Sequence, residues 1–234
     1  MVSPAPATGL RTVVLGASGA LGGAFVDALG GDPRVSEVLA LSRSSSPAFD
    51  LEDEASIAHC ADQVGRGGAV HWLIDATGAL EIDGVGPEKR LDAISAQGLM
   101  RSMLTNAIGP ALLMKHFIPL LASDAPTVYA TLSARVGSIE DNRKGGWYGY
   151  RAAKAARNML LQSAAIEASR RRPLAVFAAL QPGTVRSKLS RPFVAPSDAM
   201  APEASASQLL QVLQSLKPTG RAQFVDFKGA SIPW

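Results

Sequence analysis

The sequence predicts a single α/β domain in which helices flank a doubly wound, mostly parallel sheet. Short apolar runs recur along the chain, as is typical of strands buried on both faces. Stretches with helical spacing lie between these runs, and alternating strands and helices form right-handed βαβ units. A chain of 234 residues with 47% hydrophobic content is long enough for one such core and short for two.

The six predicted strands are near-continuous runs of Val, Ile, Leu and Ala, whereas the helices show a longer apolar period. Residues 109 and 110, a Gly-Pro pair, fall inside the longest helical stretch, so we expect a kink or break near Asn106. We expect residues 1–9 to form a flexible tail and residues 10–234 to form the domain. The strands are predicted at residues 12–15, 37–41, 70–74, 127–132, 174–180 and 222–225, and the helices at residues 20–29, 54–64, 88–122, 148–172 and 204–216.

Composition excludes several classes of partner. The net charge of +3 arises from 23 basic and 20 acidic residues spread along the chain, which argues against a nucleic-acid partner. The most apolar later stretch, residues 107–122, is too short and too polar to span a bilayer. The lone Cys60 has no partner for an internal disulfide, so we expect a cytoplasmic protein. His59, His71 and His116 lack metal-site spacing, and we expect no metal.

A glycine-rich turn follows the first predicted strand and leads into an apolar helix. In such a turn the glycines allow a tight bend and a close approach of the backbone to a pyrophosphate, which the helix N-terminus attracts. The strand-turn-helix context favours a dinucleotide site, although a glycine-rich turn can also be only a turn. The candidate residues of this turn are Gly16, Ser18, Gly19, Ala20, Leu21 and Gly22.

The end of the second predicted strand indicates which dinucleotide would bind. An NAD-type site carries an acidic residue here for the ribose 2′-hydroxyl, but this chain has Ser42 and Arg43. A guanidinium suits the additional 2′-phosphate of NADP, and a solvated loop arginine is the alternative. Asp50 is a candidate for the adenine amine or, alternatively, a cap for the following helix.

Tyr150 and Lys154 form the candidate catalytic pair. Their i, i+4 spacing places the phenol and the ammonium on one face of a predicted helix. A neighbouring cation favours the phenolate, so we expect Lys154 to lower the pKa of Tyr150 toward the working range. A tyrosine at a packed edge beside a surface lysine is the alternative.

These motifs, taken in order, resemble those of the short-chain dehydrogenase/reductase family over nearly the whole chain. More narrowly, residues 132–139, 145–148 and 232–234 are similar to the C-factor-like branch of that family. The resemblance rests on residues 16–22, Asp75, Ala76, Thr77, Gly78, Asn106, Ser133, residues 150–154 and residues 182–187.

The resemblance implies a Rossmann-type fold and a hydride transfer between the nicotinamide of NADP(H) and a carbonyl or alcohol substrate. Tyr150 would protonate the developing alkoxide, and Ser133 would donate a hydrogen bond to the same oxygen. Lys154 and Asn106 would resupply the proton through a water. The remaining cofactor contacts that the resemblance implies are Asp75, Ala76, Thr77 and Gly78 beside the adenosine, and Pro182, Gly183, Val185 and Ser187 around the nicotinamide amide.

The sequence departs from the family pattern at several positions. Asp75 replaces the usual Asn, Ser187 replaces the usual Thr, and Ala20 stands where many members have glycine. The most serious departure is Ala134, because the family's catalytic serine more often falls there. Ser133 is then our candidate, with Ser138 as the other choice.

This departure keeps a second function open. The first hypothesis is an NADPH-dependent carbonyl reductase, and the alternative is an NADP(H)-binding regulatory or signalling protein with little turnover. A homo-oligomer through the helices at residues 88–122 and 148–172 is a further expectation. The substrate pocket, expected to suit an apolar molecule of modest size, is predicted from Leu189, Phe193, Val194, Val136, Trp147 and Arg143.

Overall fold

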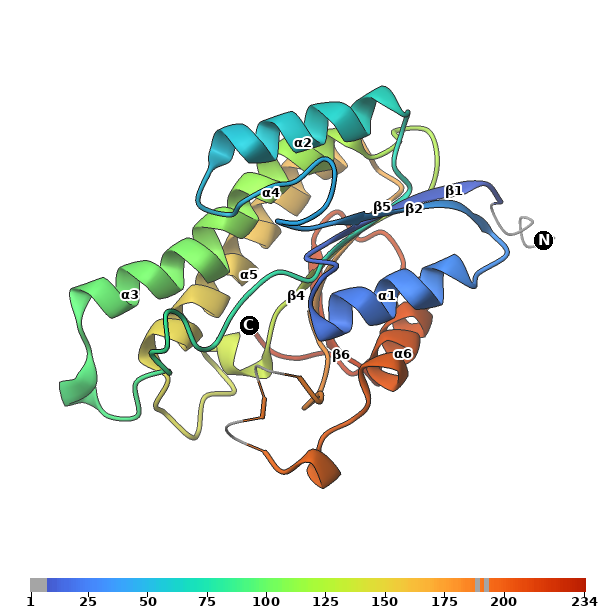
Figure 1. Cartoon of the computed structure of the whole chain (residues 1–234). Coiled ribbons are helices and arrows are strands. Elements are labelled where there is room, and N and C mark those ends of the chain that lie inside the picture. The colour runs from blue at the N-terminus through green and yellow to red at the C-terminus, as the bar shows by residue number, and fades with distance from the viewer. Residues whose placement is uncertain (1–7, 188–189, 192–193) are drawn as a thin grey trace.

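A six-stranded, all-parallel sheet forms the centre of the protein (Figure 1). The computed structural model describes residues 8–187, 190–191 and 194–234. The predicted doubly wound domain is therefore confirmed, with every described strand pair parallel. The strands, in the spatial order β2-β1-β3-β4-β5-β6, are β1 (Leu10–Leu15), β2 (Val35–Leu41), β3 (Trp72–Asp75), β4 (Thr127–Leu132), β5 (Ala175–Gln181) and β6 (Ala222–Asp226).

Helices cover both faces of this sheet, as Figure 1 shows. One apolar core joins α2, α4 and α5 to the sheet, with Ile57 and Phe177 among its fully buried members. The other core packs α1 and α6 on the opposite face around Phe25 and Leu209. The helices are α1 (Ala20–Gly30), α2 (Glu54–Arg66), α3 (Ala96–Met103), α4 (Gly109–Phe117), α5 (Tyr148–Ser169) and α6 (Pro202–Ser215).

The single helix predicted at residues 88–122 is instead a series of shorter elements. A π-helical turn, Leu104–Ile108, joins α3 to α4 and contains Asn106, so the predicted break is confirmed. Pro110 explains it, because Pro110 has no N–H to donate to the carbonyl four residues earlier, at Asn106. The Gly109 N–H accordingly bonds five residues back, to the carbonyl of Leu104.

The start of that helix was also predicted too early. Ser95 caps α3 by accepting the Gly98 N–H at 3.0 Å, so regular helix begins at Ala96. Glu88 lies outside any helix and holds the start of α5 instead. Its backbone carbonyl accepts the Trp147 N–H at 2.5 Å and its carboxylate accepts the Gly149 N–H at 3.0 Å.

The order of the strands fixes where a ligand can bind. The chain turns from β1 outward to β2 and then back to β3, so the connections leave the β1–β3 boundary in opposite directions. Such a switch point opens a crevice at the carboxyl edge of the sheet. The loops at this edge begin at Gly16 after β1 and at Ala76 after β3, and the Ala76 N–H donates to the Leu15 carbonyl at 2.8 Å.

The two ends of the chain add little to this picture. The predicted tail, residues 1–9, lies mostly outside the described residues. Among the described helices, none combines the length and apolar character needed to cross a bilayer.

Candidate active site

A cleft of about 570 Å³ opens at the carboxyl edge of the sheet, at the switch point between β1 and β3. Segments distant in sequence supply its walls: the start of α1, the ends of β3, β4 and β5, and the first turns of α5. The sequence-predicted residues that line the cleft are Ser18, Gly19, Ala20, Leu21, Gly22, Ala76, Thr77, Gly78, Ser133, Tyr150, Lys154, Pro182, Gly183, Val185 and Ser187.

In the glycine-rich turn, the backbone of Gly22 packs directly against the backbone of Gly16. Gly16 adopts a φ of +79° and donates its N–H to the Leu41 carbonyl at 2.8 Å. A Cβ on Gly22 would stand 2.2 Å from the Gly16 carbonyl oxygen, so no side chain fits there. Gly19 is the N-cap residue of α1, and no side-chain hydrogen bond caps this end of the helix. This helix start faces the cleft with partial positive charge, which fits a phosphate group.

Tyr150 and Lys154 both line the cleft and are nearly enclosed by protein. The Lys154 Nζ lies 5.5 Å from the centre of the Tyr150 ring and donates to the Leu132 carbonyl at 3.0 Å. Burial lowers the pKa of Lys154 well below its usual value, and the charge of Arg157 lowers this pKa further while Asp75 opposes both.

The expected direction of the Tyr150 pKa shift is wrong in this structure. Burial raises the pKa of Tyr150 to about 12, and the charge that opposes this rise is that of Arg157. Desolvation of the phenolate outweighs the charge of Arg157. The phenol is therefore protonated at neutral pH, as a proton donor must be.

Ser133 lies on the cleft wall, but its hydroxyl is engaged. Its Oγ donates to Asn158 Oδ1 at 2.6 Å. Ser138, the other choice, is buried and accepts the Asp141 N–H at 3.0 Å, and it lies outside the cleft lining. Ala134 does line the cleft, so the position without a hydroxyl faces the open space.

Asn106 and Gly78 bring the loop after β3 against Lys154. Asn106 clips Ala79 through two hydrogen bonds, accepting its N–H at 3.0 Å and donating to its carbonyl at 2.8 Å. Gly78 has a φ of +137°, and a Cβ there would meet Asn106 Oδ1 at 3.0 Å and Lys154 Nζ at 3.2 Å. Asn106 is thus fully buried behind the cleft wall and adjacent to the lysine.

Asp75 was predicted to contact the cofactor, and the structure corrects this. Its side chain is fully buried and forms an ion pair with the equally buried Arg157. The Asp75 carboxylate contacts Arg157 behind the cleft wall and does not line the cleft. Sequence reasoning missed Arg157, because a cation on a helix usually marks an exposed face.

A comparison with protein families shows which family this chain belongs to. Residues 24–223 match the family model described as enoyl-(acyl carrier protein) reductase. The chain belongs to the short-chain dehydrogenase/reductase family. Its C-factor-like character is also supported, because the C-signal of Myxococcus xanthus is 33% identical over 138 residues, covering 58% of this chain and 78% of that protein.

A second relative and a solved structure extend the comparison. The 1-hydroxy-2-glutathionyl-2-methyl-3-butene dehydrogenase of Rhodococcus sp. (strain AD45) is 26% identical over 189 residues, 80% of this chain and 79% of that protein. The fold matches the NADPH-bound carbonyl reductase from chicken fatty liver with a TM-score of 0.84. That match has 22% identity and covers 97% of this chain and 100% of the other.

Several predicted cofactor residues of this short-chain dehydrogenase/reductase lie off the cleft wall. Gly16 shapes the turn from behind, and Ser42 is buried, with its N–H donated to the Ser45 hydroxyl at 2.8 Å. Arg43 is exposed just beyond β2. Asp50 accepts the Glu52 N–H, but Asp53 rather than Asp50 caps α2.

The predicted substrate pocket is partly reproduced. Val136, Trp147 and Val194 line the cleft, whereas Arg143 is exposed and bonds the Glu140 carbonyl instead. Leu189 and Phe193 lie outside the described residues. Sequence reasoning missed several lining residues, which face the cleft only because strand ends and loops converge there: Leu80, Leu132, Arg135, Gln181 and Ser190.

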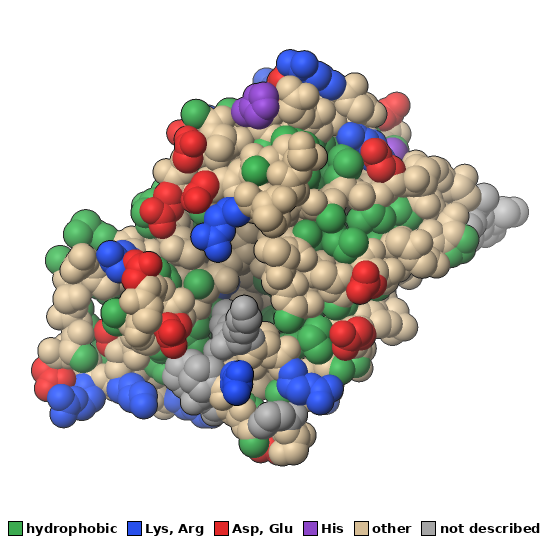
Figure 2. All heavy atoms as spheres, viewed as in Figure 1, with side chains coloured by type: hydrophobic (Ala, Val, Ile, Leu, Met, Phe, Trp, Pro, Cys, Tyr) green, Lys and Arg blue, Asp and Glu red, His purple; other side chains and the backbone are tan. Residues whose placement is uncertain are grey.

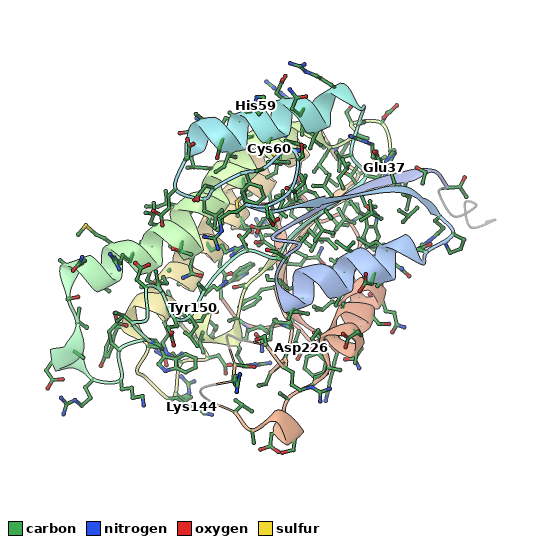
Figure 3. The ribbon with its side chains drawn as sticks, in the orientation of Figure 1. Glu37, His59, Cys60, Lys144, Tyr150 and Asp226 are labelled. Atoms are coloured by element: carbon green, nitrogen blue, oxygen red, sulfur yellow. The ribbon has the colours of Figure 1, made fainter. Side chains whose placement is uncertain are left out.

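Other candidate groups lie away from the site. Figure 3 shows His59 and Cys60 on α2, well separated from Tyr150. Cys60 is buried in the core, and burial raises the pKa of its thiol to about 11, so it packs as an inert thiol.

Among the described residues, no group of three or more His, Cys, Asp or Glu side chains could hold a metal. On the face drawn in Figure 2, basic and acidic side chains are scattered among one another.

Proposed function

We propose that this short-chain dehydrogenase/reductase is an NADPH-dependent carbonyl reductase that also oxidises the corresponding alcohol. The observation that carries this proposal is the placement of the Tyr150–Lys154 pair and of residues 18–22 of the glycine-rich turn in one cleft. A phosphate-binding turn alone indicates a nucleotide site. A protonated phenol and a buried amine in the same cleft add the acid that carbonyl reduction requires.

The cleft offers distinct positions for the parts of NADP(H). The start of α1, at residues 18–22, would hold the pyrophosphate, and Arg43 would pair with the 2′-phosphate. Ala76, Thr77 and Gly78 would contact the adenosine side, while Pro182, Gly183, Val185 and Ser187 would surround the nicotinamide. NADPH, when bound, supplies the hydride.

The chain's own residues would manage the proton. Tyr150 donates its phenolic proton to the carbonyl oxygen as negative charge develops there. Ser133 can hydrogen-bond the same oxygen only by giving up its bond to Asn158. Lys154 stabilises the phenolate that remains, and Asn106 holds the adjoining loop, with the proton resupplied through water.

The comparisons support the finer parts of this proposal. The structural neighbour from chicken liver is a carbonyl reductase solved with NADPH, and the Rhodococcus relative is a dehydrogenase. Leu80, Val136 and Val194 make part of the cleft apolar, which favours an apolar carbonyl compound of modest size. We place the protein in the cytoplasm because Cys60 is a free thiol.

We also infer a homo-oligomer through α3, α5 and the π-helical turn. Large apolar side chains are exposed on these elements, as is common at subunit contacts. The exposed residues are Met100, Ile108, Met159, Leu160 and Ile166.

The test is NADPH consumption over a panel of aldehydes, ketones and diketones, with NADH in parallel. Wild type is compared with Tyr150→Phe and with Tyr148→Phe, a matched control on the same helix that lies outside the cleft lining. We expect turnover with NADPH in wild type and Tyr148→Phe, and its loss in Tyr150→Phe. Full turnover in Tyr150→Phe would overturn the assignment of the acid.

A regulatory function is the second candidate. Ala134 on the cleft wall, the engaged hydroxyl of Ser133 and the similarity to the C-signal of Myxococcus xanthus favour it. Tight NADPH binding without turnover on any carbonyl would support this candidate over the first.

A further inference from the structure

Arg157 is a fully enclosed charged residue behind the cleft. It lies on α5 one turn beyond Lys154, and its side chain has no solvent exposure. Its guanidinium makes three different contacts: Nε donates to Thr131 Oγ1 at 2.7 Å, Nη1 donates to the Thr77 carbonyl at 2.9 Å, and Nη2 pairs with Asp75. A planar fork with fixed donor directions can satisfy three such partners at once.

Asp75 anchors this fork from the end of β3. Its Oδ1 accepts both the N–H and the hydroxyl of Thr77, at 2.9 and 2.6 Å, and its Oδ2 accepts the Thr131 hydroxyl at 3.0 Å. The carboxylate therefore holds Thr77 through its N–H and hydroxyl, and the guanidinium holds it through its carbonyl. Thr77 is a residue of the cleft wall.

The adjoining residue connects this network to the catalytic lysine. A Cβ on Gly78 would lie 3.2 Å from Lys154 Nζ and 3.7 Å from Arg157 Nη1, so the two side chains approach the same residue. Lys154 has its own bond to the Leu132 carbonyl at the end of β4. The side chains of Asp75, Lys154 and Arg157 thus link the ends of β3 and β4 to α5.

We propose that Arg157, anchored by Asp75, is a positioning residue that holds the Thr77–Gly78 wall of the cleft in register with Lys154. This inference rests on the proposed function, because its purpose is to align a cofactor wall with the catalytic amine. Asp75 is the carboxylate that forms an ion pair with Arg157, while Lys154 bonds the Leu132 carbonyl. A bond network of this kind restricts the wall to one geometry at the cost of burying charge.

The experiment uses the double variant Asp75→Asn/Arg157→Leu. Replacing both partners removes the fork without leaving one of the pair as an uncompensated buried charge, so we expect the fold to be retained. Asn still offers an oxygen to the Thr77 N–H. Arg157→Lys is the second variant, because it keeps the charge and one contact but loses the fork. Arg170→Leu, exposed at the end of the same helix, is the matched control.

Hydrogen exchange of the amides at residues 76–79 is measured in the free protein, beside NADPH affinity and carbonyl kinetics. In the double variant we expect hydrogen exchange to be about tenfold faster at these amides only. The NADPH Kd should rise and kcat should fall, each by roughly ten- to a hundredfold, while the carbonyl KM changes little. Arg157→Lys should fall between wild type and the double variant. Arg170→Leu should match wild type.

A folded double variant with wild-type exchange, NADPH affinity and kcat would overturn the proposal and leave the pair a role in packing alone. Failure of the proposed function gives a different result. In that case wild type does not bind NADPH or reduce any carbonyl, while the exchange at residues 76–79 in the free protein still reports whether Arg157 holds the wall.

Discussion

Ser133 donates its only hydroxyl proton to Asn158, 2.6 Å away, from the wall of the cleft that also exposes Ala134. A hydroxyl has one proton to donate, so it cannot serve Asn158 and a substrate oxygen together. The exchange of one partner for the other costs part of the gain that a donor gives to a developing oxyanion.

From this relationship we predict that Ser133→Ala lowers kcat by about tenfold, less than the usual loss of an oxyanion donor. Ala134→Ser in the same background should restore most of the activity, since its hydroxyl would face the open cleft. Steady-state kinetics of the two variants provide the measurement. An unchanged kcat in Ser133→Ala would show that Ser133 takes no part in the mechanism.

A second prediction concerns the turn that would hold the pyrophosphate. A Cβ on Gly22 would meet the Gly16 carbonyl oxygen at 2.2 Å, whereas a Cβ on Gly23 meets its nearest atom at 3.6 Å. Gly22→Ala must therefore displace backbone, and we expect NADPH affinity to fall at least about tenfold or the protein to unfold at a lower temperature. Gly23→Ala should match wild type in both fluorescence titration and thermal melting.

Arg43 provides a third prediction, on cofactor choice. Its exposed guanidinium follows β2, whose last residue, Leu41, accepts the N–H groups of Gly16 and Ala17. Arg43→Asp removes a charge-assisted bond to the 2′-phosphate and adds repulsion, so NADPH Kd should rise about tenfold or more while NADH Kd changes little. Parallel titrations with the two cofactors measure this. An unchanged ratio of the two constants would contradict the 2′-phosphate assignment.

The pH dependence of the two reaction directions is a fourth prediction. Burial raises the pKa of Tyr150 to about 12, so the phenol stays protonated through neutral pH and only a small fraction is phenolate. Reduction uses the phenol and should be nearly flat with pH below that pKa. Oxidation uses the phenolate, so kcat/KM for an alcohol should rise about tenfold per pH unit between about pH 6 and pH 10. In Tyr150→Phe this rise should disappear.

The buried ion pair leads to a fifth prediction, on stability. Arg157→Leu alone leaves the Asp75 carboxylate without its cation in a fully enclosed site, and we expect a loss of about 3–5 kcal/mol in the free energy of unfolding. Asp75→Asn/Arg157→Leu should recover most of this loss. Urea denaturation of the three proteins is the measurement. Equal stability of the single and double variants would show that the two charges do not interact.

The sequence was sufficient for the order of strands and helices because buried parallel strands and amphipathic helices have distinct apolar periods. It also located the break at Asn106, since proline at position 110 removes a specific backbone donor. The helix start at Ser95 was not predicted, because Glu88 has the composition of a helix start but bonds the distant residues Trp147 and Gly149.

Within the site, local motifs were easier to predict than long-range partners. The residues of the glycine turn and the Tyr150–Lys154 pair follow from short spacings and line the cleft. Asp75 and Arg157 stand 82 positions apart, so no local pattern shows that they meet. The direction of the Tyr150 pKa shift depends on burial by several segments, which spacing along one helix does not reveal.

The all-parallel sheet has a practical consequence for attaching this protein to a surface. Every described strand starts at the edge opposite the cleft, and β1 starts there at Leu10 (Figure 1). A tether placed ahead of Leu10 would turn the cleft mouth toward the bulk solution. Trp234 is a poor anchor by comparison, because its carbonyl accepts the Glu140 N–H and its ring packs on Phe224. A tether at Trp234 would exert force on Glu140, which lies in the loop just after the cleft residue Val136.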